Sequence, residues 1–439
     1  MGKGHKRGRG ESEGQESRNK SKAAKLAQKE VLPEPEWVFD EERSLRKIEP
    51  YWFTHRTMAK GRWWKRELFE VFCKEFQDQA PDYYRRAILA GKISVNNEKK
   101  PLDYVLNNGD LVCHSTHRHE PPVANHKINV IHEDGEILVI DKPPSIPVHP
   151  SGRYNYNTVL EILQSKEYGY RNLFSVNRID RLTSGILLLA LTKDKATQLA
   201  TELAERNVSK TYLCRVRGKF PQGKTPCLEP ILVVSNKLGV NVVDPLGRPC
   251  ETHFTLLSYN PDTDTSVVQC EPKTGRTHQI RVHLQFLGHP IANDPLYCNE
   301  KLWGTDMGKG GVKNKEIVLE RIKAAKDLAD LGLGDDDDVK AENAGTDSKK
   351  DALIPSSIPG DSLDADEFPC PECSIRRPDP DGKKLLIYLH CGNIQGKGGR
   401  MRQRCRDGLN QTLLNKATVK FERLKFDTSG SVGYFGGYT

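Results

Sequence analysis

The 439-residue chain lacks any apolar run near the roughly 20 residues that a membrane-spanning helix needs. The residues from Lys3 onward are charged and lack the apolar stretch of a secretory signal, and Glu11, Glu13 and Glu16 are unlike a transit peptide. No internal repeat is found either. These absences predict a protein that does not enter a membrane, and we expect it in the cytoplasm, with the nucleus and the mitochondrion as alternatives.

The cysteines lack the regular spacing of a disulfide framework. There are eleven of them, scattered along the chain, which predicts reduced thiols in an intracellular protein. An excess of one sign of charge is present, since 67 Lys and Arg stand against 59 Asp and Glu, for a net charge of +8. That balance favours a polyanionic partner such as RNA or DNA, although a basic, solvated surface explains it equally well.

Shifts in composition divide the chain into successive segments, and the length exceeds that of one typical domain. The expected segments are a disordered basic tail over 1–36, an N-terminal module over 37–120, a core over 125–300, a flexible insertion over 301–368, a return to the core over 369–391 and a basic, divergent tail over 392–439.

The N-terminal module combines two basic helices with a small hairpin. Apolar residues at helical spacing predict a helix over 66–76, and a second helix follows Pro81 and ends at Gly91. Strands are expected at 93–97 and 110–113. The module resembles the alpha-L RNA-binding domain of many RNA-modifying enzymes, and this resemblance implies RNA contacts from Arg85, Arg86 and Lys92.

The core reads as many strands with intermittent helices. Strands are expected at 128–132, 137–141, 185–192, 209–217, 252–259 and 266–271, and helices at 157–164, with Asn157 as the N-cap, and at 195–206. This mixed order favours an α+β fold with a largely antiparallel sheet over a doubly wound parallel one.

One carboxylate stands out within residues 177–185, Asn-Arg-Ile-Asp-Arg-Leu-Thr-Ser-Gly, because it lies between two arginines directly before a strand apolar enough to be buried. The neighbouring cations Arg178 and Arg181 favour the ionised form of Asp180. Taken alone, the segment is more typical of a structural ion pair.

Three further segments carry chemically useful side chains: 141–150, 210–212 and 274–291. In the last of them Thr277 is expected to cap a helix that Gly288 ends. Helical spacing puts His278, Arg281 and Gln285 on one face of that helix.

Together these four segments resemble the RluA class of RNA pseudouridine synthases. The family pattern runs Asp-Lys-Pro-x-Gly-x-x-Val-His, His-Arg-Leu-Asp-x-x-Thr-Ser-Gly, Lys-x-Tyr and Thr-Gly-Arg-x-His-Gln-x-Arg-x-His, and all four parts occur here in this order. The sequence departs from the pattern at Ser145, Asn177 and Ile179, where the family usually has Gly, His and Leu. None of these removes a group that the chemistry needs, although Asn177 could change how the turn is pinned.

The resemblance implies that the bond from ribose to the base nitrogen of uridine is broken, the base rotates, and the bond re-forms through carbon 5. No redox step, metal or cofactor is expected. Asp180 would be the catalytic carboxylate, acting on ribose or base as nucleophile or general base. Arg281 would pair with it, and Tyr212 would stack on the target base. The residues expected to contact RNA around them are Arg178, Arg181, Arg276 and His278.

The segments 51–54, 62–64, 370–373 and 387–390 resemble the eukaryotic tRNA pseudouridine synthases that act at uridine 32. This implies a tRNA anticodon stem-loop as partner, whose target base must leave its stack to reach a pocket. A monomer is the default expectation.

Three competing interpretations remain. The Cys370-x-x-Cys373 pair fits half of a zinc deaminase site, but no histidine is followed two places later by Glu. A structural zinc site would need two more ligands, and only Cys391 or Cys405 is near enough in sequence to add to the pair, at irregular distance, so no metal is predicted. A non-catalytic RNA-binding or assembly factor on a synthase fold is the last alternative, which the joint presence of Asp180, Tyr212 and Arg281 disfavours.

Overall fold

The computed structural model describes residues 35–76, 79–205, 208–235, 238–312, 314–324, 370–374 and 378–396, which form two compact units. The smaller unit contains Glu49–His119 and the described part of Asn343–Pro378, and the larger unit contains the rest. Nearly all of the tail expected over 1–36, most of the insertion and most of the basic C-terminal tail lie outside the described residues.

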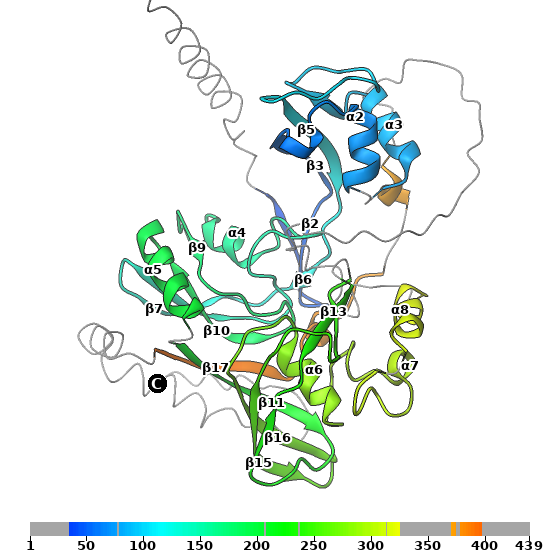
Figure 1. The fold of residues 1–439 in the computed structure, drawn as a ribbon. Coiled ribbons are helices and arrows are strands. Elements are labelled where there is room, and N and C mark those ends of the chain that lie inside the picture. Colours follow the sequence, from blue (N-terminus) through cyan, green and yellow to red (C-terminus); the bar gives the residue numbers. More distant parts are fainter. Residues whose placement is uncertain are drawn as a thin grey trace, which may run out of the picture. The chain divides into compact units, whose positions relative to one another are not determined.

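The smaller unit packs short helices on a three-stranded antiparallel sheet (Figure 1). The strands, in sheet order, are β3 (Tyr51–Met58), β5 (Leu111–Arg118) and β4 (Ile93–Val95). The helical segments are η1 (Gly61–Trp63), α2 (Leu68–Val71), η2 (Phe72–Phe76), α3 (Pro81–Leu89) and η4 (Pro371–Ser374).

The two predicted helices of this unit are present. The first begins at Leu68 and continues through Phe76, so that its apolar side chains enter a core with Trp63 and Tyr84. The second starts with Pro81, where a missing N–H costs nothing, and is followed by Gly91 at a φ of +70°.

The larger unit is built on a nine-stranded sheet. Its strands, in sheet order, are β12 (Lys224–Cys227), β15 (Thr252–Asn260), β16 (Thr265–Pro272), β11 (Val208–Arg217), β17 (Leu389–Gly396), β10 (Ser184–Ala190), β8 (Ile137–Lys142) and β7 (Asn129–Glu133), with β9 (Phe174–Ser175) paired to β10. Among these described strands, every pairing is antiparallel except that of β10 with β17. The predicted α+β class with a largely antiparallel sheet is confirmed.

Strand β17 comes from the far end of the described chain and lies between β10 and β11, as the orange arrow in Figure 1 shows. It completes the sheet that carries residues 180 and 212, because β11 holds the second of these and the loop before β10 holds the first. The sheet would be split into two halves without it.

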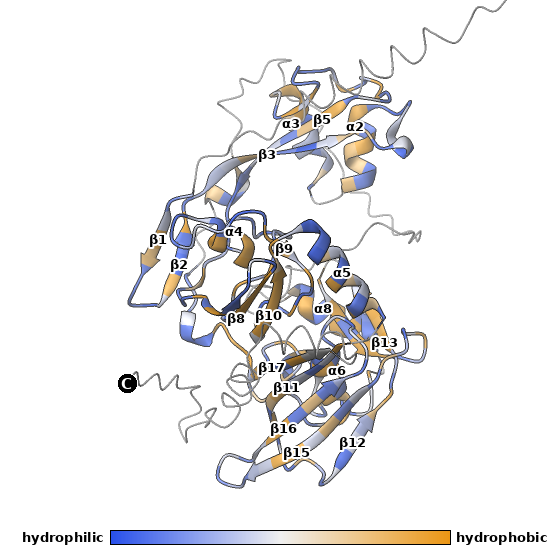
Figure 2. Ribbon diagram, turned by 90° about the vertical axis from the view of Figure 1, so that its left-hand side faces the viewer, coloured by the Kyte–Doolittle hydropathy of each residue, from blue (hydrophilic) through white to orange (hydrophobic). Residues whose placement is uncertain are grey.

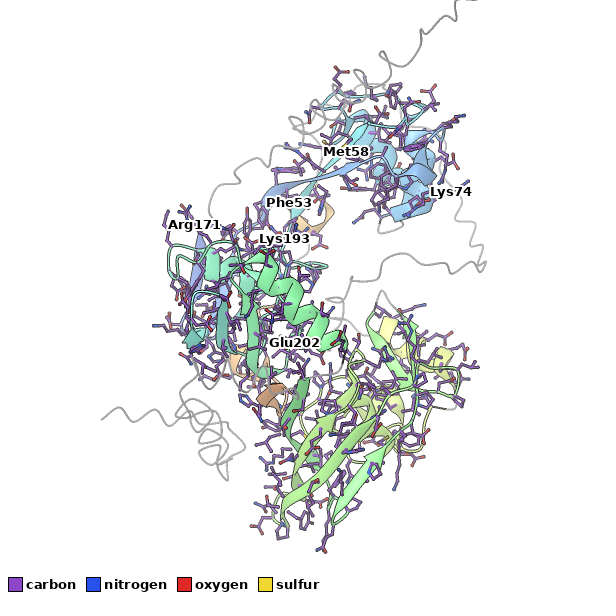
Figure 3. The ribbon with its side chains drawn as sticks, turned by 60° about the vertical axis from the view of Figure 1, so that its left-hand side comes forward. Phe53, Met58, Lys74, Arg171, Lys193 and Glu202 are labelled. Atoms are coloured by element: carbon purple, nitrogen blue, oxygen red, sulfur yellow. The ribbon has the colours of Figure 1, made fainter. Side chains whose placement is uncertain are left out.

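Two smaller sheets and several helices surround this sheet. The added strands are β1 (Trp37–Asp40), β2 (Leu45–Ile48) and β6 (Val123–Ala124) in one sheet and β13 (Ile231–Ser235) and β14 (Val240–Val243) in another. The helices are α4 (Val159–Gln164), α5 (Lys193–Ala204), α6 (Gln279–Phe286), α7 (Glu300–Trp303), α8 (Lys315–Ala324) and the short η5 (Gly382–Lys384). Figure 3 shows α5 extending between Lys193 and Glu202.

The N-cap predicted for α4 is wrong by one residue. Thr158, not Asn157, accepts the hydrogen bond from the backbone N–H of Glu161. The Asn157 side chain instead accepts from Trp37 Nε1 at 3.1 Å and donates to the carbonyl of Pro121 at 3.1 Å. The Asn157 side chain therefore bonds to residues distant in sequence, and the neighbouring Thr158 caps the helix.

The core of the larger unit follows the strand alternation. Leu138 and Ile140 of β8 lie against Leu187 and Leu189 of β10 with almost no exposed surface. Figure 2 colours β10 mainly as hydrophobic, whereas β8 ends in the hydrophilic pair Asp141 and Lys142. A second cluster lies beneath α6 and includes Leu284. Within the described residues, no helix has the length and apolar character to cross a bilayer.

Candidate active site

The loop between β9 and β10 holds Asp180 four residues before the start of β10, a strand inside the sheet. Its apolar neighbours Ile179 and Leu182 are buried in the core, and the backbone N–H of Thr183 closes a turn on the carbonyl of Asp180 at 3.0 Å. Asn177 Oδ1 accepts a bond of 3.4 Å from the N–H of Leu188, so the residue that departs from the family pattern pins the loop to β10. The Asp180 side chain is 22% exposed.

A fully buried lysine, Lys142, is hydrogen bonded to the loop that contains Asp180. Lys142 Nζ donates to the carbonyls of Pro143 at 2.8 Å, Ile146 at 2.7 Å and Arg181 at 3.1 Å. Burial, followed by the charge of Arg181, lowers the pKa of Lys142 to about 7. The three carbonyl acceptors match the three donors of an ammonium group and oppose that effect. Lys142 thereby links segment 141–150 to the loop of Asp180.

Only glycine fits at position 185. A Cβ placed there would lie 2.3 Å from the carbonyl oxygen and 2.5 Å from the nitrogen of Cys391, and its φ is +113°. Gly185 thus lets β17 approach β10 closely enough to pair with it. Beside it, Ser184 Oγ and His390 Nδ1 are hydrogen bonded at 3.0 Å.

The turn before α6 is held by one glutamine. Gln279 Oε1 accepts from Thr274 Oγ1 and from the N–H of Arg276, both at 2.9 Å. Its Nε2 donates to the carbonyl of Glu251 at 3.0 Å and to Thr252 Oγ1 at 2.8 Å. These bonds use the whole amide and tie residues 274–279 to residues 251 and 252.

Helix α6 begins one residue later than predicted. Its N-cap is His278 in the left-handed region, with a φ of +57° and no side-chain capping bond, where the sequence had indicated Thr277. The left-handed geometry turns the imidazole into the pocket instead. Gly288 follows the helix with a φ of +81°, as its position predicts.

Arg281 lies between two carboxylates. It is buried and forms a bidentate pair with Asp294, with Nε 2.7 Å from Oδ2 and Nη2 3.0 Å from Oδ1. Its third nitrogen, Nη1, lies 3.7 Å from Asp180 Oδ2. Burial by itself would lower the pKa of Arg281, but the charge and hydrogen bonds of Asp294 raise it overall. The guanidinium is therefore a fixed cation facing Asp180.

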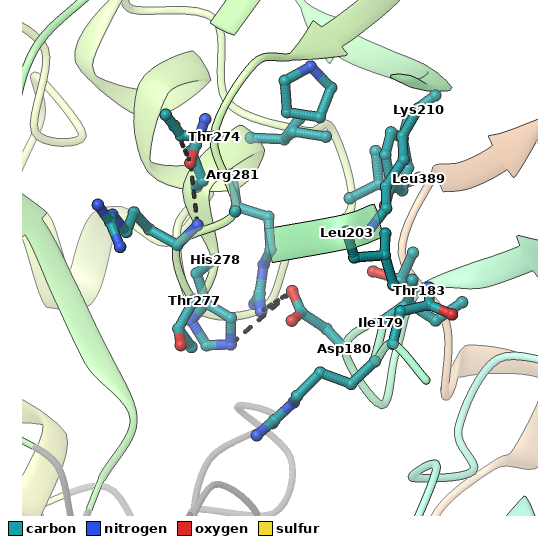
Figure 4. Close-up of a pocket in the computed structure, with 18 of the residues that line it drawn as sticks. Ile179, Asp180, Thr183, Leu203, Lys210, Thr274, Thr277, His278, Arg281 and Leu389 are labelled. Carbon is teal, nitrogen blue, oxygen red and sulfur yellow. Dashed lines mark hydrogen bonds and ion pairs between the residues drawn. The ribbon is translucent and has the colours of Figure 1, made fainter. Parts of the chain in front are cut away.

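His278 approaches the same carboxylate oxygen. Its Nε2 lies 4.0 Å from Asp180 Oδ2, and its Nδ1 is hydrogen bonded to the Tyr297 hydroxyl at 3.0 Å. Figure 4 shows Asp180 facing both His278 and Arg281, with dashed lines to each. Both groups approach Oδ2, so they lie on one side of the carboxylate.

These groups line a pocket of about 560 Å³, within the usual range of small-ligand sites. Tyr212 and Lys210, two residues apart on β11, line it as well. Burial, with Cys391 nearby, raises the pKa of Tyr212 well above its usual value, so the phenol stays neutral. Burial lowers the pKa of Lys210.

The arginines predicted around the site are distributed differently. Arg178 and Arg276 line the same pocket. Arg181 does not, because it is nearly buried and its guanidinium lies over the Tyr154 ring, 5.6 Å from the centroid.

The three candidate residues of the N-terminal module lie on the smaller unit. Arg85 is exposed with its guanidinium over the Phe69 ring, and Arg86 pairs with Asp82 at 3.0 Å. Lys92 Nζ lies 4.0 Å from the centroid of the Trp52 ring. Whether RNA binds there stays a prediction.

Sequence reasoning missed Asp294 and Tyr297, the residues behind Arg281 and His278. Both are buried. Asp294 Oδ1 also accepts from the N–H groups of Leu296 and Tyr297 at 3.0 and 2.9 Å, which makes it the centre of a tight loop. The sequence offers only a weak signal for this loop, namely an Asp three residues before an aromatic residue.

The sequence of the chain is similar to those of known proteins. The RNA pseudouridylate synthase family matches residues 136–286. Human pseudouridylate synthase RPUSD2 is 40% identical over 396 residues, which cover 81% of this chain and 72% of the human protein. The mitochondrial tRNA pseudouridine(32) synthase of Saccharomyces cerevisiae is 46% identical over 298 residues, covering 67% of this chain and 63% of the yeast protein. Ribosomal large subunit pseudouridine synthase C of Haemophilus ducreyi is 35% identical over 261 residues, covering 55% of this chain and 80% of that protein.

These similarities extend well beyond the four motifs, since the human relative aligns with most of both chains. They confirm the enzyme class that the motifs predicted. The chain belongs to the RluA-type family of RNA pseudouridine synthases.

Proposed function

We propose that this enzyme converts uridine 32 of the tRNA anticodon stem-loop to pseudouridine, with Asp180 as its catalytic carboxylate. The observation that carries the proposal is the carboxylate of Asp180, held at Oδ2 by Arg281 and His278 within a pocket of about 560 Å³. The tRNA assignment is supported by the yeast relative named for position 32, which is 46% identical.

A relative named for tRNA position 31 is the reason to test the position directly. It is 34% identical over 298 residues and covers 59% of this chain. Both names imply an anticodon stem-loop, so the two candidates differ by one nucleotide. The higher identity favours position 32.

The reaction conserves atoms and electrons. The bond between C1′ and N1 breaks, and a bond between C1′ and C5 forms, while N1 gains one proton and C5 loses one. Asp180 acts either as a nucleophile on the nucleotide or as a base. Because Arg281 and His278 both approach Oδ2, we assign the contact with the substrate to Oδ1. The cations of the site stabilise the carboxylate without taking part in bond changes.

Tyr212 supplies a flat, neutral wall for the extruded base. Strand alternation places it on the same face of β11 as Lys210, and both line the pocket. Stacking on an aromatic ring offsets part of the few kcal/mol needed to unstack a base. Arg178 and Arg276, on the walls of the pocket, are suited to phosphate contacts.

The test of the catalytic role compares Asp180→Asn with the wild-type chain on a tRNA transcript, with pseudouridine mapped by primer extension after carbodiimide labelling. Asp180→Asn should lower the rate at least about 1,000-fold and leave tRNA affinity nearly unchanged. The matched control is Asp262→Asn, an exposed loop residue, which should retain wild-type activity. Retention of activity by Asp180→Asn would overturn the assignment.

The position is tested with transcripts in which uridine 31 or uridine 32 is replaced by cytidine. Loss of the product only in the second transcript supports the proposal. Loss only in the first would move the target to position 31 and leave the chemistry of Asp180 intact. Tight tRNA binding by the wild-type chain with no product on any transcript would favour the non-catalytic alternative.

A further inference from the structure

Four side chains with metal-binding atoms converge in the smaller unit, apart from the pocket of Asp180. They are His117, His119, Cys370 and Cys373, and their ligand atoms all lie within 4.8 Å of one another. His117, His119 and Cys370 are half-buried, and Cys373 is exposed. The function proposed above uses none of them.

Four of the six distances between these atoms lie close to the edges of a zinc tetrahedron. His117 Nδ1 and His119 Nε2 are 3.2 Å apart. Cys373 Sγ lies 3.2 Å from His117 Nδ1 and 3.4 Å from His119 Nε2, and Cys370 Sγ lies 3.5 Å from His119 Nε2. Zinc bond lengths of about 2.0–2.1 Å to nitrogen and about 2.3 Å to sulfur give tetrahedral edges of about 3.3 Å between nitrogens and about 3.5 Å between nitrogen and sulfur.

Each pair of ligands comes from a rigid local structure. His117 lies in β5 and His119 just after its end, and residues two apart on an extended chain point to the same side. Cys370 and Cys373 belong to a single turn at η4, in which the N–H of Cys373 bonds to the carbonyl of Cys370 at 3.2 Å. A Cys-x-x-Cys turn commonly supplies two of the four ligands of a structural zinc site.

We propose that His117, His119, Cys370 and Cys373 bind one Zn²⁺ ion, which ties the end of β5 to the η4 turn. The two segments are separated by 251 residues along the chain, counted from His119 to Cys370. On binding, each thiol loses its proton, and the two thiolates neutralise the charge of the ion. With four protein ligands the coordination is closed, so the site is structural and has no open position for a substrate.

Packing around the ligands supports a structural role. The Trp52 ring lies 5.1 Å from the imidazole of His117, between centroids, and these two residues are opposite each other in the pairing of β3 with β5. Lys92 Nζ lies over the same indole, 4.0 Å from the centroid of Trp52. The ion would thereby hold the strand that supports a candidate RNA-binding lysine.

Neither ordinary hydrogen bonding nor a disulfide accounts for the cluster as well as a metal ion does. Thiols are weak hydrogen-bond donors, and bonds among two thiols and two imidazoles do not require all four groups to converge. A disulfide between the cysteines would leave both imidazoles without a reason to face the sulfurs, and both cysteines are free thiols.

The prediction of no metal rested on Cys391 and Cys405 as the available additional ligands. Cys391 is buried in β17 of the larger unit, and Cys405 lies outside the described residues. The two histidines of β5 and the residue after it supply the missing ligands instead.

The test uses the full-length chain purified without chelator, with its metal content measured by inductively coupled plasma mass spectrometry. About one zinc ion per chain is expected, and Cys373→Ser should lower the affinity by more than the roughly 10–100-fold typical of losing an outer partner. The matched control is Cys73→Ser, a half-buried thiol of the same unit outside the cluster, which should retain the zinc.

Replacing the zinc by Co²⁺ reports on the ligands through the absorption spectrum, so a lost ligand can be distinguished from a variant that fails to fold. The Co²⁺-loaded wild-type chain should show tetrahedral d–d bands and a thiolate charge-transfer band. Cys373→His keeps four ligands, so the d–d bands should persist while the charge-transfer band falls to about half, because one of two thiolates remains. Absence of zinc from the wild-type chain, absence of these bands, or an unchanged charge-transfer band in Cys373→His would each overturn the proposal. None of these readouts uses synthase activity.

Discussion

Replacing Asp294 by Asn tests whether the buried pair with Arg281 holds the active site together. Asn keeps an Oδ1 acceptor for the N–H groups of Leu296 and Tyr297. Its NH₂ group, however, takes the place of Oδ2, which in the wild type accepts from Arg281 Nε at 2.7 Å. The guanidinium loses its charged partner at a site that is 2% exposed. Removing one partner of a buried ion pair costs about 3–5 kcal/mol, a large share of the roughly 5–15 kcal/mol that stabilises a typical domain.

The loss is best measured locally, by hydrogen exchange of the peptide that contains residues 294–297, because the chain has two units and global unfolding need not be two-state. We expect the opening free energy of this peptide to fall by about 3–5 kcal/mol. Because Arg281 is then free to move closer to Asp180, turnover should fall about 10–100-fold with little change in KM. Asp244→Asn, which breaks the more exposed pair with Lys315, is the matched control and should leave the opening free energy nearly unchanged.

The double variant Asp294→Asn with Arg281→Met distinguishes the effect of a buried, unpaired charge from the effect of lost contacts. It removes the unpaired charge, so it should regain much of the stability that Asp294→Asn loses, while its turnover should fall below that of Asp294→Asn. A double variant that is no more stable than the single one would refute the reasoning from a buried unpaired cation. Wild-type exchange and turnover in Asp294→Asn would refute the supporting role of the pair altogether.

The same pair predicts a pH dependence with a defined sign. Burial would raise the pKa of Asp294, but the charge and hydrogen bonds of Arg281 outweigh this and lower the pKa below its usual value. A carboxylate whose pKa is lowered in the folded state stabilises that state above its unfolded pKa of about 3.9, and the contribution is lost as the pH falls through the folded pKa. The difference between wild type and Asp294→Asn should therefore be constant above about pH 5 and shrink only below about pH 4.

Three further changes probe the supports of the site. Gly185→Ala places a methyl group against the backbone of Cys391 and should destabilise the larger unit by more than about 3 kcal/mol in urea titrations. The control Gly223→Ala also has a positive φ, +80°, but open space around it, and should cost only about 1–2 kcal/mol. Equal losses of stability in the two variants would show that φ alone matters. Lys142→Met leaves three buried carbonyls without a donor and should lower turnover more than it raises KM, a split that steady-state kinetics measures and that a substrate-binding role would reverse. Tyr212→Phe keeps the aromatic wall and should stay within about tenfold of wild-type turnover, while Tyr212→Leu should fall much further; equal loss in both would assign the hydroxyl a chemical role.

Local sequence was sufficient to mark the three residues to which we assign the chemistry. Asp180, Tyr212 and Arg281 were found because each stands in a short motif, and the structure places all three on one pocket. The class of the sheet followed from alternation in the strands. Local signals failed where a distant partner intervened, as at Asn157, whose side chain bonds to Trp37 across 120 residues instead of capping its own helix.

The supporting role of Lys142 escaped prediction because its hydrogen bonds are made to the backbone. Lys142 donates to backbone carbonyls, and its contact with residue 181 spans 39 positions. Every residue has a carbonyl, so no side-chain identity on the accepting side could mark that contact in the sequence. Support of this kind becomes visible only once the fold brings the two segments together.

The cluster of His117, His119, Cys370 and Cys373 differs, because both sides consist of side chains with recognisable chemistry. Proximity in sequence to Cys370 was the wrong criterion for its partners, since they lie on a strand and its end 251 positions or more earlier. A His-x-His at the end of a strand and a Cys-x-x-Cys turn are each incomplete as a metal site, since zinc in a structural role takes four ligands. Two incomplete halves of complementary type within one chain therefore predict a contact between their segments, and that inference could be made from sequence before any fold is known.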